Sequence, residues 1–263
     1  MRALVLSVAA LSLSTAVAAD TAYVKPSDVS PEMGQTISVE VAFNDVCCEP
    51  KYAVRTDTFA VIGSDGDAVD PDRIEIFSTV TVLEHTFTQT GTSRITTGER
   101  LGRKGEYVLL DGTYHLVNSP DAEPIDVPEG APILTSQTAT VTDAYVTVGA
   151  PDWGAIRRSV GRLAIEPALH PSGASVGLPF IGRVTFDGDP VPGQDVFLTN
   201  EAQRLSGKSG WMTQTDDEGL FTIPLNDPGV SLLMVRMQAP APQDAETDIR
   251  SYTTALTLNV SAD

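Results

Sequence analysis

The sequence has few of the residues that build metal cages, redox centres or disulfide frameworks. It contains two cysteines, adjacent at Cys47 and Cys48, and three histidines. His85, His115 and His170 are too far apart in the sequence for the His-x-His or His-x-x-x-His spacings of zinc and nickel sites. Two neighbouring cysteines cannot form a disulfide framework, so the fold must rest on apolar cores.

Common catalytic motifs are also missing from the sequence. It has no Gly-x-Ser-x-Gly nucleophile elbow, no His-Glu-x-x-His zinc motif and no phosphate-binding glycine loop ahead of a helix. Among the many acids, nothing singles out a catalytic pair. We therefore expect no enzymatic activity, and the cofactor, if there is one, stays unknown.

Long apolar runs are missing after the first residues. Met1-Arg2, an apolar stretch over 3–13 and the small residues Ala16-Val17-Ala18-Ala19 form a secretory signal, so 1–19 is predicted to be a signal peptide. No later stretch approaches the roughly 20 apolar residues of a spanning helix, so no transmembrane segment is expected in the mature chain. The first cysteine is Cys47, far from the cleavage site, which argues against a lipid anchor. We expect export to the periplasm.

Basic residues are scarce relative to acidic ones. The chain has 17 Lys and Arg against 35 Asp and Glu, for a formal net charge of −18. A surface this acidic repels nucleic acid and anionic lipid, so no nucleic-acid partner is expected.

What the sequence does contain is a succession of short β-patterns. In 36–43 (TISVEVAF), Ile37, Val39 and Val41 alternate with polar residues, as in a half-buried strand. Further strands are predicted over 58–62, 73–77, 79–87, 93–97, 106–110, 113–117 and 138–148, with a hairpin turn at Asp111-Gly112. These strands predict an N-terminal β-sandwich domain over 20–150, and a proline-rich loop is expected over 118–135.

The second half of the chain has the same character. About seven short strands are expected, near 163–166, 178–186, 194–199, 211–215, 220–223, 230–237 and 252–260, which is typical of an immunoglobulin-like sandwich. Asp187-Gly188 and Asp217-Glu218-Gly219 are predicted turns. We place the domain boundary in 149–161. The fold class is therefore all-β, with two β-sandwich domains, and the C-terminal domain covers 160–263.

The adjacent cysteines allow three interpretations. Cys47 and Cys48, followed by Glu49, suit a soft metal such as copper(I) or zinc, or a redox site. A vicinal disulfide is the second alternative, because an oxidising compartment favours bonding between neighbouring thiols. The third is a pair of buried small apolar side chains. The predicted metal ligands are Cys47 and Cys48.

Other polar residues suggest structural roles. His85 is in phase with Leu83 and Phe87, so it is expected to pack in the core. The acids of 65–72 (DGDAVDPD) lack the spacing of a helix–loop–helix calcium loop, since Val69 and Ile76 stand where ligands would be needed. A solvated hairpin turn is the better interpretation of this cluster.

Several segments in a fixed order resemble a known family. They are AYVKPSDVSPEMGQTISVEVAF (22–43), DTFAVIGSDG (57–66), GTSRITTGERLGRKGEY (91–107), VTDAYVTVGAP (141–151) and, in the second half, FDGDPVPGQDVFL, TDDEGLFTIPLNDPG and SYTTALTLNV. Together they resemble the exported two-domain β proteins assigned to the periplasmic component of nickel or cobalt uptake, a family otherwise of unknown function. The resemblance extends over nearly the whole mature chain.

The resemblance implies an immunoglobulin-like or prealbumin-like second domain, a periplasmic location and a role in holding divalent metal for a membrane transporter. Family members often begin the mature chain with a histidine-bearing stretch, which has no counterpart at Asp20-Thr21-Ala22-Tyr23. The leading expectation is a periplasmic accessory protein that handles divalent or soft metal ions for a transporter. The alternative is a non-catalytic structural or protein-interaction module of the cell envelope.

Overall fold

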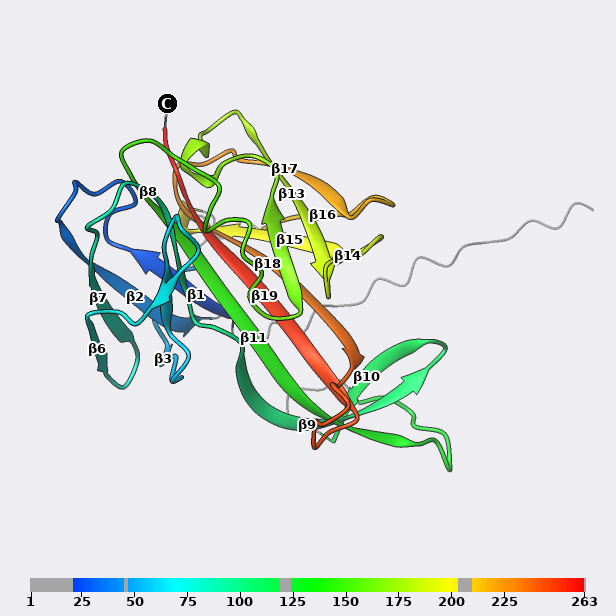
Figure 1. The fold of residues 1–263 in the computed structure, drawn as a ribbon. Helices are drawn as coiled ribbons and strands as arrows, with labels where there is room; N and C mark the ends of the chain where they lie inside the picture. The colour runs from blue at the N-terminus through cyan, green and yellow to red at the C-terminus, as the bar shows by residue number, and fades with distance from the viewer. Residues whose placement is uncertain (1–20, 45–46, 119–123, 203–209, 263) are drawn as a thin grey trace, which may run out of the picture.

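The fold is built almost wholly of β-strands. The structure is a computed structural model that describes residues 21–44, 47–118, 124–202 and 210–262. Its strands form a five-stranded, a ten-stranded and a four-stranded sheet (Figure 1). This confirms the predicted all-β fold class. The predicted signal peptide at 1–19 lies outside the described residues.

The three sheets are assembled from elements scattered along the chain. The five-stranded sheet consists of β1 (Thr21–Pro26), β2 (Thr36–Asn44), β3 (Tyr52–Ala53), β6 (Arg73–Ile76) and β7 (Thr81–Thr86). The ten-stranded sheet consists of β4 (Ala60–Ile62), β5 (Ala68–Val69), β8 (Gly91–Thr96), β9 (Arg100–Leu110), β10 (Thr113–Val117), β11 (Ile133–Val148), β15 (Asp195–Asn200), β16 (Trp211–Gln214), β18 (Gly229–Pro240) and β19 (Ile249–Val260). The four-stranded sheet consists of β12 (Leu163–Pro167), β13 (Pro179–Phe186), β14 (Asp189–Pro190) and β17 (Leu220–Pro224), and the short 3₁₀-helix η1 (Pro171–Gly173) lies between β12 and β13.

The ten-stranded sheet is shared by two sandwiches that pack on its opposite faces. Successive side chains of a strand point to opposite faces, and β11 shows this directly. Its Val146 belongs to one core with Val39 and Leu83 of the five-stranded sheet. Its neighbour Tyr145 belongs to a second core with Phe180 of the four-stranded sheet. We call these the N-terminal core and the C-terminal core.

The two sandwiches are joined by a parallel strand pair. Strand β11 runs parallel to β19, from Ser136 opposite Ile249 to Ala144 opposite Thr257. Both strands are buried over most of their length, as parallel strands covered on both faces usually are. Figure 1 shows them side by side through the middle of the molecule. The division into domains at 20–150 and 160–263 stays a prediction, and the shared sheet runs across it.

The predicted turns are present. Asp111 and Gly112 have φ of 50° and 79° and connect β9 to β10. Asp187 and Gly188 have φ of 54° and 86° and connect β13 to β14. Positive φ at both central residues is the type I′ pattern that the aspartate–glycine dipeptides predicted. Gly219 also has a positive φ of 73°, and a Cβ there would lie 2.8 Å from a backbone oxygen of Val184.

The largest differences from the expected strand limits lie in β9 and β11, which pair with each other. Strand β9 begins at Arg100 rather than 106, and β11 begins at Ile133 rather than 138. The predicted loop over 118–135 is therefore too long, because 133–135 pair with β9; residues 119–123 lie outside the described part. Strand β9 has a single buried residue, Val108, and is otherwise exposed or half-buried, so its sequence carries no strong apolar alternation. Among the described residues, no helix is long and apolar enough to cross a membrane.

Candidate functional site

The predicted metal ligands Cys47 and Cys48 form a vicinal disulfide. Their Cα atoms are 3.7 Å apart, and Cys48 has a φ of 78°, in the left-handed region that few side chains adopt. Both residues are buried, with 1% and 4% of their surface exposed. The structure thus holds the second of the three alternatives. A metal prefers a thiolate to a disulfide sulfur, so ligation by this pair requires reduction and stays a prediction.

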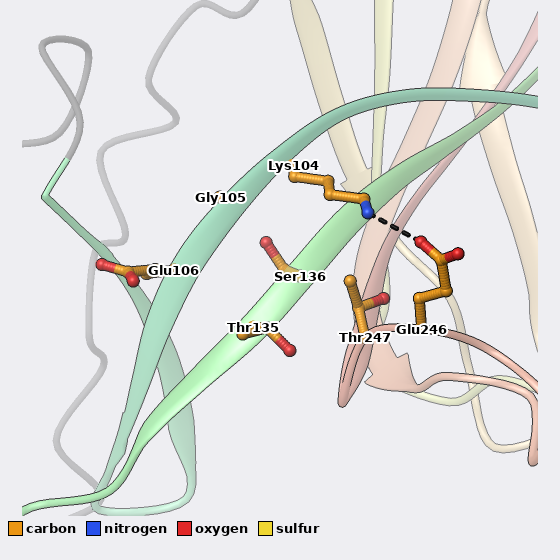
Figure 2. Close-up of a pocket in the computed structure, with 7 residues that line it drawn as sticks. All are labelled: Lys104, Gly105, Glu106, Thr135, Ser136, Glu246 and Thr247. Atoms are coloured by element: carbon orange, nitrogen blue, oxygen red, sulfur yellow. Dashed lines mark hydrogen bonds and ion pairs between the residues drawn. The ribbon is translucent and has the colours of Figure 1, made fainter.

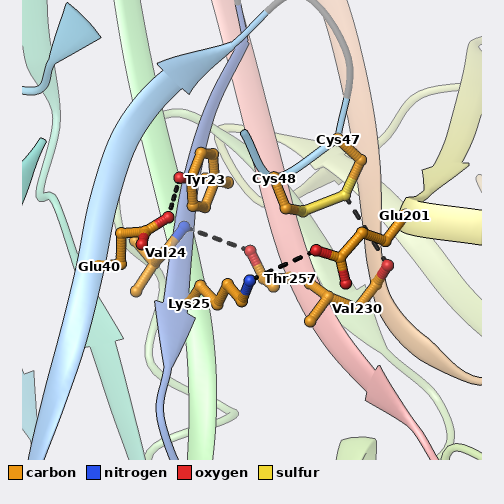
Figure 3. The surroundings of a disulfide bond; sticks show 9 residues. All are labelled: Tyr23, Val24, Lys25, Glu40, Cys47, Cys48, Glu201, Val230 and Thr257. Carbon is orange, nitrogen blue, oxygen red and sulfur yellow. Dashed lines mark hydrogen bonds and ion pairs between the residues drawn. A yellow bond between two sulfur atoms is a disulfide. The ribbon is translucent and has the colours of Figure 1, made fainter. Parts of the chain in front are cut away.

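The disulfide lies where the five-stranded sheet meets the ten-stranded sheet (Figure 3). It packs in a small cluster with Tyr23 of β1, Ala42 of β2, Leu232 of β18 and Ala255 of β19. We call these residues and the two cysteines the apolar joint. The Sγ of Cys47 is 3.8 Å from the carbonyl oxygen of Val230, and the backbone N–H of Val24 donates to Oγ1 of Thr257 at 3.3 Å. The pair therefore helps to hold β1 and β2 against β18 and β19.

Polar groups beside the apolar joint are already paired. The Tyr23 hydroxyl donates to the carboxylate of Glu40 (Figure 3). Burial and this hydrogen bond both raise the pKa of Tyr23, so its phenol stays protonated and cannot serve as a base. Lys25 forms an ion pair with Glu201 at 3.6 Å. In the part of the chain that the structure describes, no three or more His, Cys, Asp and Glu side chains gather into a group that could hold a metal ion.

The three histidines lie on separate elements and do not form a site. His85 on β7 packs edge-on against the core residue Phe87, with ring centroids 5.0 Å apart, but it is half-buried at the border of the core rather than inside it. His170 contacts the carbonyl oxygen of Asp152 at 2.8 Å and the hydroxyl of Thr92 at 3.2 Å through Nε2. His170 therefore fixes the segment before β12 to β8, a structural role that its position in the sequence did not reveal.

Asp65 and Asp67 of the acidic cluster at 65–72 lie in the predicted hairpin turn between β4 and β5, and the cluster continues past β5. The N–H of Gly63 donates to the carbonyl oxygen of Asp67 at 2.8 Å, and the N–H of Asp67 donates to the Asp65 carboxylate at 3.0 Å. Both aspartates are exposed. Their charges thus serve local turn geometry and solvation.

A second joint, on the opposite face of the shared sheet, is polar. Arg94 of β8 is buried and donates to the carboxylate of Asp143 on β11 and to the carbonyl oxygen of Arg158. Burial acts to lower the pKa of Arg94, but the neighbouring Asp143 raises it, so the guanidinium stays charged. Arg162 binds Asp187 through both fork nitrogens and donates to the Tyr252 hydroxyl at 2.8 Å. We call Arg94, Asp143, Arg162 and Asp187 the polar joint.

An open pocket of about 370 Å³ lies between β9, β11 and the loop before β19 (Figure 2). Its lining is polar and consists of Lys104, Gly105, Glu106, Thr135, Ser136, Glu246 and Thr247. The Nζ of Lys104 is 2.8 Å from the carboxylate of Glu246, and both side chains are well exposed. Because its charged groups already pair with each other in water, this pocket resembles a solvated groove more than a ligand site.

The N-terminal sandwich is open along one side. In the register of the five-stranded sheet, Ile74 lies opposite Leu83, which is in the N-terminal core. In the facing sheet, Val69 lies opposite Val61, which is also in that core. Yet Val69, Ile74 and Ile76 are 52%, 41% and 43% exposed, although they are on the core-facing sides of their sheets. We call strand β6 and these three side chains the open edge.

The backbone of β6 offers free hydrogen-bonding groups at this edge. Within the described residues, β6 pairs only with β7 and is the last strand of its sheet. The N–H of Phe77 donates to the carbonyl oxygen of Val80 at 2.9 Å. In an antiparallel ladder, hydrogen-bonded pairs alternate, so Glu75 and Arg73 also face β7, while the backbone groups of Ile74 and Ile76 face outward. The sequence pattern predicts this strand but not that its edge and apolar side chains stay uncovered.

A family model described as "Domain of unknown function (DUF4198)" matches residues 17–239. None of the curated proteins matches the chain. Among solved structures, the chain is similar to the D0-D1 domain of intimin, with 11% identity, coverage of 90% of this chain and 97% of that one, and a TM-score of 0.22. It is also similar to the Yersinia pseudotuberculosis adhesin InvE, with 15% identity, coverage of 92% and 59%, and a TM-score of 0.21. At these scores, neither likeness carries an argument about function.

Proposed function

This chain belongs to the DUF4198 family of domains of unknown function, and we propose that it is a non-catalytic protein-interaction module of the cell envelope. The open edge is the observation that carries this proposal. Strand β6 combines outward-facing backbone groups with side chains of Ile74 and Ile76 that are more than two-fifths exposed. A free edge of this kind binds an extended segment by adding a strand to the sheet.

The exposed apolar groups at the open edge give such a strand something to cover. Monomeric proteins usually blunt their edges, because an uncovered apolar edge invites pairing with other chains. On the same side of this sheet, Leu83 opposite Ile74 and Val39 opposite Leu83 are each 1% exposed. An added strand beside β6 would extend this core over Ile74 and Ile76, and the lost apolar exposure would favour binding.

Two further features support a location in the cell envelope. Disulfides persist in oxidising compartments, and Cys47 and Cys48 are joined by one. The sequence also predicts a signal peptide at 1–19 followed by a strongly acidic chain. Both features are consistent with export to the periplasm.

Metal handling for a membrane transporter stays a prediction of the resemblance. The family description assigns no function, and the two predicted ligands are bonded to each other rather than free. The interaction module therefore has the stronger structural support of the two alternatives.

Photo-crosslinking in intact cells tests the proposed function. A benzophenone side chain replaces Phe77, which is 55% exposed next to the open edge, or Leu178, which is 57% exposed near the four-stranded sheet and serves as the matched control. We expect protein adducts at Phe77 and none at Leu178. Ile74→Lys places a charge at the edge, which opposes strand pairing, and should abolish the adducts. An absence of adducts at Phe77 contradicts the proposal.

A further inference from the structure

We propose that the strand added at the open edge is β6 of a second copy of this chain, paired antiparallel about a two-fold axis through Ile74. The inference rests on the proposed function and names the partner of that surface. Three properties of the sequence Arg73-Ile74-Glu75-Ile76 support it: the outward hydrogen-bonding groups, the order of the charges and the closure of the resulting pair.

The hydrogen-bonding pattern of β6 permits this pairing. The N–H and C=O of Ile74 both face the free edge, because those of Arg73 and Glu75 face β7. When two antiparallel strands meet at a residue of this kind, the residue and its copy exchange both of their hydrogen bonds. An axis through Ile74 therefore joins the two strands at their centre without disturbing the ladder with β7.

The order of the charges selects the register. With the axis at Ile74, Arg73 lies directly opposite Glu75 of the second copy. On the other side of the axis, Glu75 lies opposite Arg73 of the second copy. The two side chains are 61% and 51% exposed on the outer face of the sheet, where Arg73 already binds Glu75 of its own strand at 3.0 Å. Shifting the axis to Glu75 would place two carboxylates opposite each other, and directly opposed like charges are destabilising.

At the axis the apolar face of the strand is also self-complementary, whereas Ile76 lies opposite Asp72 of the second copy. In the same register, Ile74 lies opposite Ile74 of the second copy, on the side of the sheet that carries the N-terminal core. Each copy covers an isoleucine that is 41% exposed in the single chain. An isologous pair uses the same edge of both copies and closes on itself. The contact is therefore expected to stop at a dimer, and its short strand makes it weak and transient.

Reversal of single charges tests the register. Arg73→Glu gives a chain with two acidic residues at the pairing positions, and Glu75→Arg gives a chain with two basic ones. Each variant alone should dimerise about tenfold more weakly than the wild type, because both cross-strand pairs become like-charged. An equimolar mixture of the two variants should recover wild-type affinity, because every opposing pair in the mixed dimer is then of opposite charge.

Sedimentation velocity on the mature protein gives the affinities, over about 1 to 300 µM to cover weak interfaces. Thermal unfolding of each variant checks that the fold is kept, and Ile74→Lys is a second variant that should remove dimerisation. Leu178→Lys, at a residue with 57% exposure outside the open edge, should leave dimerisation unchanged. A wild-type chain that stays monomeric over this range overturns the inference, as do single variants that associate like the wild type or a mixture that does not recover.

The crosslinking experiment separates this inference from the proposed function. A benzophenone adduct at Phe77 with twice the mass of the chain supports self-pairing. An adduct with a different protein, together with a monomeric wild type, overturns self-pairing and leaves the interaction module in place. A monomeric wild type with no adduct at all removes both.

Discussion

The two joints of this molecule hold the same shared sheet by different chemistry. The apolar joint packs Tyr23, Ala42 and the disulfide against β18 and β19. The polar joint, on the opposite face, depends on the buried Arg94–Asp143 pair and on Arg162 with Asp187. The difference follows from what each joint fixes in place. The apolar joint packs strands against a sheet, and the backbone groups of strands are already paired. The polar joint holds the irregular segment around 149–162, whose backbone carbonyl groups need hydrogen-bond donors.

Arginine suits the polar joint because its guanidinium offers several donors in a fixed plane. Arg94 uses them for Asp143 and the carbonyl oxygen of Arg158. Arg162 uses them for Asp187, the Tyr252 hydroxyl and the carbonyl oxygen of Pro240. The comparison therefore predicts that stability depends more on the arginines of the polar joint than on the disulfide of the apolar joint.

The largest effect is expected from breaking the buried ion pair. Arg94→Met leaves Asp143 charged, buried and unpaired, which should lower the free energy of unfolding by about 3–5 kcal/mol. Urea denaturation measures the change. The double variant Arg94→Met, Asp143→Leu removes both charges and should recover much of the loss. An Arg94→Met protein as stable as the wild type would show that the pair does not hold the joint.

A smaller loss is expected at the exposed end of the polar joint. Arg162→Ala removes the bonds to Asp187 and Tyr252, and because these groups are partly solvated the loss should be about 1–2 kcal/mol. Arg162→Lys keeps the charge but not the planar fork, so it should restore only part of the stability. Full restoration by lysine would mean that charge alone matters here. The same denaturation measurement serves both variants.

Reduction of the disulfide should cost less again. A disulfide stabilises mainly by restricting the unfolded chain, and the restriction grows with the length of the loop it closes. Cys47 and Cys48 are adjacent, so reduction should lower the free energy of unfolding by only about 1 kcal/mol. Thermal melts with and without a reducing dithiol test this. A loss as large as that from Arg94→Met would reverse the ranking of the two joints.

Much of the fold is predictable from the sequence wherever one strand face is covered. Ile37, Val39 and Val41 alternate with polar residues because one face meets the N-terminal core, and the strand lies where the pattern predicts it. Asp111-Gly112 specifies its turn locally. The pairing of β11 with β19 is not predictable in this way, because parallel register between distant segments leaves no local signal.

The candidate site was less predictable than the fold. Adjacent cysteines suggested a metal site, a disulfide or simple burial, and the choice depends on residues from β1 and β18 that surround them. Arg94 is an ordinary residue of strand β8 in the sequence, and only folding brings it to Asp143. The exposure of Ile74 is likewise a property of the fold, because among the described residues no strand covers the outer side of β6.

The free energy of unfolding should depend slightly on pH through His85, which lies in the five-stranded sheet on the apolar-joint side. Burial lowers the pKa of His85 from its ordinary 6.5, and Asp72 opposes this shift. The unfolded chain therefore takes up a proton before the folded chain does as the pH falls. The contribution of His85 to stability is full above about pH 6.5 and decreases as the pH falls through the folded pKa. His85→Phe should flatten this dependence in melts between about pH 5 and 8, and an unchanged slope would contradict the assignment.

The last prediction concerns metal affinity, and we expect nickel to bind only weakly. The predicted mature end, Asp20-Thr21-Ala22, has no histidine, and carboxylate is a weaker nickel ligand than imidazole. Calorimetry should show binding no tighter than roughly micromolar. Tighter binding of copper(I) or zinc should appear only after reduction and should disappear in the Cys47→Ser, Cys48→Ser variant. Nanomolar nickel binding in that variant would favour metal transport over the interaction module.

The parallel pair of β11 and β19 has a consequence for the order in which the molecule assembles. Strand β19 is the last strand along the described chain, yet it stands between β18 and β11 in the middle of the widest sheet. Contacts between segments so distant in sequence form slowly, because a long loop must close first. The N-terminal strands can collapse while the chain is still being synthesised, but the shared sheet is completed only when β19 pairs with β11 and β18. A chain that ends before residue 249 would therefore leave β11 and β18 each with an unpaired edge, and such edges invite pairing with other chains.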